Sequence, residues 1–423
     1  MGEELTGIEL TGKILGVFSC FLENANKTLF YQNGAMNRRS FLLGSLWAGI
    51  MVMARGWWET LGMKLWTGNH SLRRAKIFNK AAHASLPPGI KEAMFYRRLE
   101  GKRVQCTTCF RMCIESPGGR GFCRVRENRD GKYYSLVYSM PSAIHIDPIE
   151  KEPQLHMLPG TNILCFGTVG CNFKCRHCHN WHLSQASPGD LRGYYFPPER
   201  AVETALKNKI PTISFTYNEP TVFYEYVYDV AVLAKENGLK ILWHSNGAMN
   251  PEPLKELLKY TDAVTIDLKG FTTKAYQNSS ARLKPVLRTI EIIKNQGKWL
   301  EIVNLIIPTI NDDPNDIRDM CQWIKDNVGV DVPLHFSRFF PSYRLTHLSP
   351  TPISTLETAR DIGVSVGLHY VTLGNVPGHR YNSTFCPACG KRVIHRIHFQ
   401  VLEININDGR CKFCGHEIPG IWS

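Results

Sequence analysis

Short apolar runs alternate with amphipathic helical patterns from about residue 160 onward. The runs typical of buried strands are 161–169, 212–216, 240–245, 263–268, 299–307, 332–336 and 370–373. The helical patterns between them cover 198–208, 222–237, 253–259, 284–295 and 314–327. Repeated β-α units imply a parallel sheet with right-handed crossovers. The pattern therefore predicts an α/β fold with about seven parallel strands.

A three-cysteine loop follows the first of these strands. Cys171, Cys175 and Cys178 have the spacing C-x3-C-x2-C. Fully ligated 4Fe–4S clusters use four cysteine thiolates, so three on one loop predict a cluster with one open iron. A zinc knuckle is the alternative, with His177 or His179 as the fourth ligand that zinc requires. Because the loop ends a strand, we expect it where α/β folds place their sites.

This loop resembles the signature of the radical S-adenosylmethionine (radical SAM) enzymes. The flanking sequence resembles more specifically the radical SAM enzyme of the AmmeMemoRadiSam system, a relative of the pyruvate formate-lyase activating enzymes. The resemblance runs from about Gly101 to the C-terminus and is carried by residues 147–153, 156–160, 178–181, 183–185, 216–221, 223–226 and 374–378. His177 and His179 depart from it, because the family usually has an aromatic residue and glutamine there; neither position is a cluster ligand.

The resemblance implies an open partial (β/α) barrel that binds a 4Fe–4S cluster and S-adenosylmethionine. In the family, the open iron chelates the amino and carboxylate groups of this cofactor. One electron then cleaves the sulfonium C–S bond, which gives methionine and a 5′-deoxyadenosyl radical that abstracts hydrogen from a substrate. The cofactors supply the chemistry and the protein positions them, so no catalytic side chain is assigned beyond the cluster ligands.

Polar residues at later strand ends are candidates for positioning S-adenosylmethionine. Glu219 resembles the segment that receives the methionine amino group, although it could instead cap the following helix. Ser245 and Asn246 end the next strand, where they could meet the ribose or the carboxylate. Asp267 and Lys269 resemble the Asp-x-Lys of the activating enzymes, which lies near the methionine carboxylate; a surface ion pair is the alternative. His335 and Arg338 are weaker candidates at another strand end.

Two further cysteine groups have metal-type spacing. Four cysteines with Gly-rich turns form an N-terminal module that suits zinc or an auxiliary 4Fe–4S cluster, with iron–sulfur slightly favoured: Cys106, Cys109, Cys113 and Cys123. The C-terminal pairs, separated by a hairpin-like stretch, have a spacing close to that of a zinc ribbon: Cys386, Cys389, Cys411 and Cys414. Such grouping indicates a reducing compartment rather than secreted disulfides.

The chain has 423 residues, 43% of them hydrophobic, which is enough for two or three domains. We divide it into residues 1–58, an N-terminal extension; 59–100, a linker; 101–150, the Cys-rich module; 151–380, the radical SAM partial barrel; and 381–423, the zinc-ribbon-like module. The net charge of +13 is scattered rather than gathered in a stripe. Nucleic acid is therefore not the expected partner, although the charge permits it.

The N-terminal extension carries a twin-arginine-like segment. Arg38 and Arg39 precede an apolar run from Phe41 to Met53, which is too short for a standard spanning helix. Export of a folded protein and peripheral membrane tethering are the two interpretations. Because S-adenosylmethionine and low-potential electron donors are cytoplasmic, we expect the enzyme to face the cytoplasm, with twin-arginine export as the alternative.

Three classes of function are compatible with these features. The first is a radical SAM enzyme that takes electrons from a low-potential donor and acts on an unidentified substrate or partner protein, with activation of a glycyl-radical enzyme as one form. The second is an RNA-modifying radical SAM enzyme. The third is a pure electron carrier, which the open three-cysteine site disfavours because carriers usually close their clusters with four ligands.

Overall fold

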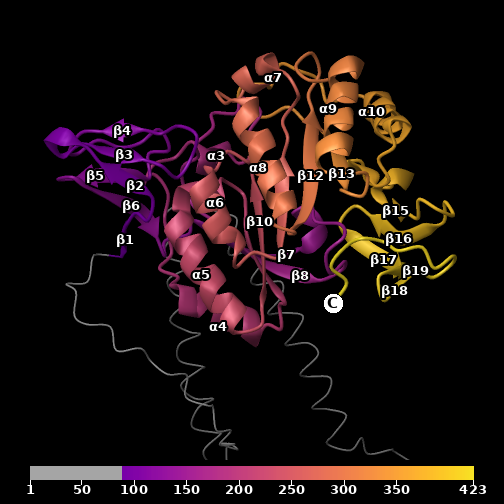
Figure 1. Cartoon of the computed structure of the whole chain (residues 1–423), viewed down its shortest axis with the longest axis horizontal. Coiled ribbons are helices and arrows are strands. Elements are labelled where there is room, and N and C mark those ends of the chain that lie inside the picture. Colours follow the sequence, from indigo (N-terminus) through magenta and orange to yellow (C-terminus); the bar gives the residue numbers. More distant parts are fainter. Residues whose placement is uncertain (1–87) are drawn as a thin grey trace, which may run out of the picture. The chain divides into compact units, whose positions relative to one another are not determined.

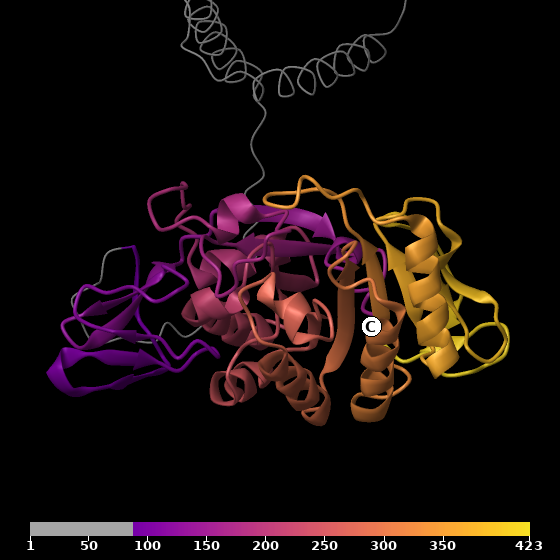
Figure 2. The ribbon, with the colours of Figure 1, turned by 90° about the horizontal axis from the view of Figure 1, so that it is seen from above.

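The computed structural model describes residues 88–423, which form a central sheet with a small β module at each end of the chain segment (Figures 1 and 2). The twin-arginine-like segment and residues 59–87 of the expected linker lie outside the described residues. Within the described part, no helix combines the length and hydrophobicity that crossing a membrane would require.

The central sheet has eight strands in the order β14-β13-β12-β11-β10-β9-β8-β7. The strands are β7 (Ala143–Pro148), β8 (Asn162–Gly167), β9 (Thr212–Phe215), β10 (Lys240–Ser245), β11 (Ala263–Asp267), β12 (Trp299–Ile306), β13 (Leu334–Arg338) and β14 (Val371–Gly374). From β8 to β14 every neighbouring pair is parallel, which confirms the predicted parallel sheet. The sheet is open, and β7 is an antiparallel edge strand that the hydrophobic pattern did not predict.

Helices connect the parallel strands and cover the sheet, as the β-α pattern predicts. They are α3 (Trp181–Ser184), α4 (Pro198–Lys207), α5 (Tyr224–Glu236), α6 (Pro251–Leu258), α7 (Thr273–Gln277), α8 (Leu283–Asn295), α9 (Pro314–Asn327) and α10 (Ile353–Val366). Figure 1 shows α4, α5, α6, α8 and α9 in front of the strands. Helix α9 illustrates the local cause: Asp313 caps it by accepting from the Asn315 amide at 2.8 Å, and Pro314 occupies its first turn.

The N-terminal module consists of two three-stranded sheets. One has the order β1-β6-β5, with β1 (Gly89–Glu92), β5 (Arg126–Arg129) and β6 (Lys132–Tyr138); the other contains β2 (Tyr96–Arg98), β3 (Val104–Cys106) and β4 (Ile114–Glu115). A hairpin turn joins β5 to β6, because Arg129 pairs with Lys132 across Asp130 and Gly131, which both have positive φ. A 3-10 turn, η1 (Glu100–Lys102), joins β2 to β3.

The C-terminal module contains a three-stranded sheet and a two-stranded ribbon. The strands are β15 (Thr384–Phe385), β16 (Arg392–Ile397), β17 (Gln400–Ile404), β18 (Ile406–Asn407) and β19 (Arg410–Cys411). This module is tied to the segment before β8: the Arg396 guanidinium donates to the Leu155 carbonyl at 2.5 Å, and the Ile421 amide donates to the His156 carbonyl at 2.8 Å. The remaining 3-10 turns are η2 (Ile149–Lys151), η3 (Pro220–Phe223) and η4 (Arg380–Asn382).

The loop after β8 is packed tightly against the N-terminal module at Gly170. This residue has φ of 86°, and a Cβ atom built on it would lie 2.5 Å from the Cys123 carbonyl oxygen and 2.7 Å from a Val125 methyl group. Only glycine avoids both the left-handed strain and the clash with backbone. The contact fixes the three-cysteine loop relative to the four-cysteine module.

We expect Gly170→Ala to destabilise the protein more than Gly189→Ala. Both positions have positive φ, so each substitution should cost about 1–2 kcal/mol of backbone strain. A Cβ at Gly189 meets nothing within 4 Å, whereas at Gly170 it also meets the Cys123 backbone, which adds about 1–3 kcal/mol of overpacking. Chemical denaturation of the two variants measures the difference. Equal unfolding free energies would contradict the packing argument.

Candidate functional site

A cavity of about 470 Å³ lies at the carboxyl ends of the parallel strands. The three loop cysteines and the five main candidates for positioning S-adenosylmethionine line it: Cys171, Cys175, Cys178, Glu219, Ser245, Asn246, Asp267 and Lys269. The weaker candidate Arg338 does not line it. They come from the loop after β8 and from the ends of β9, β10 and β11. The structure therefore brings together groups that are separated by nearly a hundred residues in the sequence.

The three loop cysteines are free thiols at one end of this cavity. The Phe173 amide lies 3.3 Å from the Cys171 sulfur and donates to it, and the Cys178 sulfur lies 3.3 Å from the Ser184 hydroxyl. Burial raises the pKa of the Cys175 thiol to about 11. Thiolates here consequently need a positive partner, such as a metal centre, before they are stable at neutral pH.

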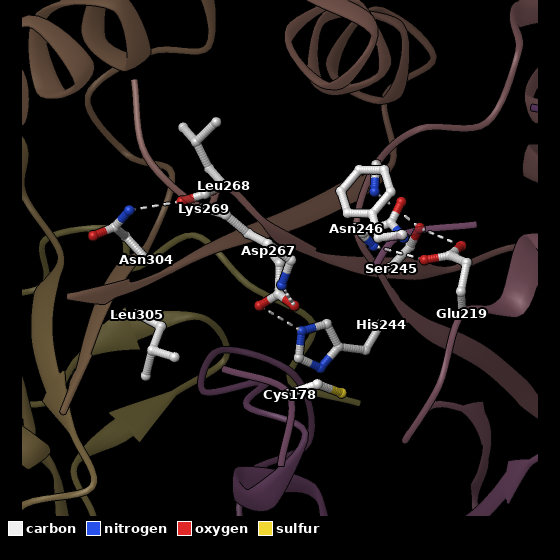
Figure 3. A network of polar contacts seen from close by, with 12 residues as sticks. Cys178, Glu219, His244, Ser245, Asn246, Asp267, Leu268, Lys269, Asn304 and Leu305 are labelled. Atoms are coloured by element: carbon white, nitrogen blue, oxygen red, sulfur yellow. Dashed lines mark hydrogen bonds and ion pairs between the residues drawn. The ribbon is translucent and has the colours of Figure 1, made fainter. Parts of the chain in front are cut away.

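Asp267 lies between the Lys269 ammonium and the His244 imidazole ring at the end of β11. Its carboxylate is 2.7 Å from the Lys269 ammonium and 3.1 Å from the His244 ring nitrogen, and Figure 3 shows Asp267 and His244 facing each other. Burial opposes ionisation of Asp267, yet the charges of Lys269 and His244 outweigh it and hold the pKa of this carboxyl well below its usual range. One carboxylate thus serves two potential cations, which leaves this corner of the cavity electropositive.

Glu219 is buried and already has hydrogen-bond partners. Its Oε1 atom accepts from the Thr221 amide at 3.0 Å and from the Ser245 hydroxyl at 2.8 Å, and its Oε2 atom accepts from the Asn246 amide at 2.8 Å (Figure 3). Capping of the next turn, η3, is therefore an observed role of Glu219. The Oε2 atom keeps capacity for a further donor, because a carboxylate has about four acceptor positions.

One residue of the cavity, His244, was not found by sequence reasoning. In the sequence, His244 lies inside a predicted strand and carries no sign of a role in the site. The structure shows that it faces Asp267 on the neighbouring strand. His177 is buried in the cavity wall with an unpartnered Nδ1 atom, and burial lowers its pKa to about 3, so the ring is neutral. His335 is held by Glu301 at 2.6 Å and by the Thr372 hydroxyl at 2.7 Å.

Glu301 is the centre of a buried network beneath the cavity. Its carboxylate accepts from the Leu155 and His156 amides, each at 2.8 Å, as well as from His335. Burial alone would raise its pKa, but these donors and the nearby His156 lower it to about 2. The network joins β12, β13 and the segment before β8. Arg338, the other weak candidate, donates to the Thr351 carbonyl at 2.8 Å.

The two remaining cysteine groups form separate sites. In the C-terminal module the Cys386 and Cys414 sulfurs are 3.7 Å apart, and those of Cys389 and Cys411 are 3.8 Å apart. Within residues 88–423 these four make up the only set of three or more Cys, His, Asp or Glu residues whose ligand atoms all lie within 4.8 Å of one another. The N-terminal set lines a different, small cavity: Cys106, Cys109, Cys113 and Cys123.

Comparison with known proteins identifies the class to which this site belongs. Residues 166–324 match the model of the radical SAM superfamily. The matched segment begins in β8 and ends in α9. The uncharacterized protein MJ0808 of Methanocaldococcus jannaschii is 44% identical over 331 residues, which are 78% of this chain and 99% of that protein. The chain therefore belongs to the radical SAM superfamily. It is accordingly an enzyme.

More distant relatives have named activities. A pyruvate formate-lyase-activating enzyme of Clostridium pasteurianum is 25% identical over 191 residues, or 42% of this chain and 76% of that enzyme. A putative glycyl-radical enzyme activating enzyme of M. jannaschii is 26% identical over 173 residues, or 37% of this chain and 66% of that protein. Among solved structures, Streptococcus suis SuiB bound to S-adenosylmethionine has a TM-score of 0.42 at 14% identity, covering 54% of this chain and 53% of that chain.

A 4Fe–4S cluster and S-adenosylmethionine are the cofactors that the superfamily implies, and the cavity fits both. Three free thiols face it, and the sulfur atoms are not gathered as tightly as those of the C-terminal set, which suits ligands on separate irons rather than one ion. Lys269 and Glu219 line the same cavity, one with an ammonium group and the other with a carboxyl group. The cavity volume is within the range of small-ligand sites.

We expect Glu301→Gln to lower the free energy of unfolding by at least about 3 kcal/mol, because it removes one partner of a buried, hydrogen-bonded pair. Glu403→Gln, on the exposed face of β17, is the matched control and should change stability little. Chemical denaturation followed by tryptophan fluorescence measures both. If the two variants unfold alike, the network around Glu301 does not support the cavity floor.

Proposed function

We propose that Cys171, Cys175 and Cys178 hold a 4Fe–4S cluster and that the enzyme uses it to generate a substrate radical. The observation that supports this most directly is that three free thiols share one cavity with Asp267, Lys269 and the carboxyl group of Glu219. When bound, the cluster supplies an electron that cleaves S-adenosylmethionine to methionine and a 5′-deoxyadenosyl radical for hydrogen abstraction.

The residues around the cluster position the methionine part of S-adenosylmethionine. Lys269 neutralises the carboxylate, and Asp267 holds the Lys269 ammonium in place and keeps it charged. Glu219 accepts from the ammonium through Oε2, the oxygen with spare capacity. Ser245 and Asn246 fix Glu219 and present their polar atoms to the cavity wall.

The substrate is proposed to be a segment of a partner protein, which is also the substrate class implied by the names of the activating-enzyme relatives. A second hollow of about 420 Å³ adjoins the cofactor cavity and shares Lys151, Asn180 and Tyr217 with it. Basic and aromatic residues line this hollow, among them Arg192 and Tyr194. The second hollow supports this proposal because it extends the space beyond the cofactor cavity. Modification of an RNA is the alternative that the positive charge permits.

Working conditions follow from the chemistry. A low-potential electron donor must reach the cluster, and S-adenosylmethionine must be supplied continuously. Both are cytoplasmic resources, so we place the catalytic part of the chain on the cytoplasmic side, whether or not the twin-arginine-like segment tethers it to a membrane.

The test of this function is anaerobic reconstitution followed by reduction and assay of 5′-deoxyadenosine. Cys175→Ala should abolish its formation, because the cluster loses one of only three thiolate ligands. Cys321→Ala, a buried cysteine of α9 outside all three groups, is the matched control and should retain activity. Full activity of Cys175→Ala would refute the proposed cluster site.

Lys269→Ala should weaken S-adenosylmethionine binding without loss of iron. One lost charged hydrogen bond costs about 1.5–3 kcal/mol, which corresponds to about 10- to 150-fold in affinity. The exposed Lys274, on α7, gives the control substitution Lys274→Ala. Isothermal titration of the reconstituted variants measures both affinities. An unchanged isotherm for Lys269→Ala would exclude this residue as the carboxylate partner.

We also propose that the C-terminal cysteines hold one structural zinc ion. Tetrahedral zinc–thiolate bonds of 2.3 Å place sulfurs about 3.8 Å apart, as observed for Cys386 with Cys414 and for Cys389 with Cys411. Cys389→Ala should therefore lose about one zinc per chain and expose residues 384–418 to protease. A metal-free module that resists protease as well as the unsubstituted chain would contradict this proposal.

A further inference from the structure

The four cysteines of the N-terminal module enclose a small cavity of their own. Cys106 ends β3, and Cys109, Cys113 and Cys123 come from the loops that follow, so the module closes around the four sulfurs. All four are free thiols. The Phe122 amide donates to the Cys113 sulfur at 3.4 Å. Four thiols gathered in a small fold with little core of its own indicate a metal centre.

Three buried donors around this cavity have no hydrogen-bond partner: the Tyr133 hydroxyl, Arg126 Nε and Asn172 Nδ2. Their residues are 0%, 2% and 0% exposed, so water does not satisfy them from the surface. A zinc ion with four cysteine ligands adds no acceptor beyond the thiolates. A 4Fe–4S cluster adds inorganic sulfides, which accept such hydrogen bonds and are stabilised by them.

The arrangement of the sulfurs also differs from that of the C-terminal set. In the C-terminal set the four sulfur atoms all lie within 4.8 Å of one another. In the N-terminal module no three of the four sulfur atoms do. A single tetrahedral ion draws its ligands together, while a cluster binds each thiolate at a different iron. The wider spacing favours the cluster.

This cavity shares a wall with the three-cysteine loop. Asn172, next to Cys171, lines it, and the Arg111 guanidinium donates to the Asn172 carbonyl at 3.0 Å. The Phe110 and Phe173 rings pack edge to face with centroids 5.8 Å apart. Together with the close approach of Gly170 to Cys123, these interactions connect the four-cysteine module directly to the three-cysteine loop.

We propose that Cys106, Cys109, Cys113 and Cys123 bind a second 4Fe–4S cluster, which relays electrons to the centre at Cys171, Cys175 and Cys178. The second cluster accepts one electron from a donor protein, such as one of the flavodoxin or ferredoxin class, and returns to its oxidised state as that electron moves on. Only the relay role rests on the proposed function; the presence of the cluster does not.

Metal analysis of the full chain with Cys171, Cys175 and Cys178 all replaced by alanine tests the site without altering it. After anaerobic reconstitution this variant should retain about four irons and as many sulfides per chain, and an iron–sulfur electron paramagnetic resonance signal on reduction. Adding Cys109→Ser should remove them. Zinc in place of iron, or no metal beyond that of the C-terminal module, would overturn the assignment. This readout does not depend on cleavage of S-adenosylmethionine.

Tyr133→Phe, made in the same triple-alanine background, tests the unpartnered hydroxyl. Its iron content should be unchanged, while the reduction potential of the remaining cluster should fall, because a hydrogen bond to sulfur favours the reduced, more negative cluster. Tyr134→Phe, on the same strand and outside the cavity lining, is the control and should leave the potential unchanged. Equal potentials would show that Tyr133 does not face a cluster.

The relay is tested with Cys109→Ser in the otherwise unchanged chain. Formation of 5′-deoxyadenosine should fall at least about tenfold with a flavodoxin donor system, yet be largely retained with dithionite, which is small enough to reduce the first cluster directly. Equal rates with the protein donor before and after substitution would overturn the relay. Absence of product from the unsubstituted enzyme with dithionite would instead count against the proposed function.

Discussion

Parallel pairing of successive strands is the constraint on which the site depends. Because β8 to β11 run in the same direction and are neighbours in sequence order, the residue that follows each strand emerges at the same edge of the sheet. The three-cysteine loop, Glu219, Asn246 and the pair of Asp267 and Lys269 therefore line one cavity, although they are not close in sequence. The nearly continuous burial of these strands leaves their ends as the places where polar groups reach a cavity.

Charge balance decides what this cavity can accept. Asp267 is shared between Lys269 and His244, and Glu219 is held by neutral donors alone. The cavity thus has an ammonium group at one corner, that of Lys269, and the carboxyl group of Glu219 at another. Burial leaves few water molecules to screen the pair of Asp267 and Lys269, whereas it raises the pKa of the Glu219 carboxyl. The same burial makes the thiols depend on a metal centre to become thiolates.

Much of the parallel sheet could be predicted from the sequence, because each buried strand is a short apolar run and α4, α5, α6, α8 and α9 each show helical periodicity. Helices α3, α7 and α10 were not predicted. The edge strand β7 escaped prediction because its residues Ala143–Pro148 alternate weakly and are half exposed. The Asp267 and Lys269 pair was predicted from its resemblance to the Asp-x-Lys of the activating enzymes. The contact of His244 with Asp267 depends on the strand register and joins residues more than 20 positions apart. The contact of Glu301 with Leu155 joins residues more than 140 positions apart. No local sequence pattern encodes either contact.

The attachment of the C-terminal module to residues 155–158 has a consequence for the order of synthesis. His156 and Leu158 exchange hydrogen bonds with Ile421, and Leu155 accepts from Arg396. The amides of Leu155 and His156 are the ones that Glu301 binds. On the ribosome, this segment emerges long before its partners and must wait for more than two hundred residues to follow. The floor of the cavity is therefore among the last parts of the protein to be completed, after the helices that surround it have been translated.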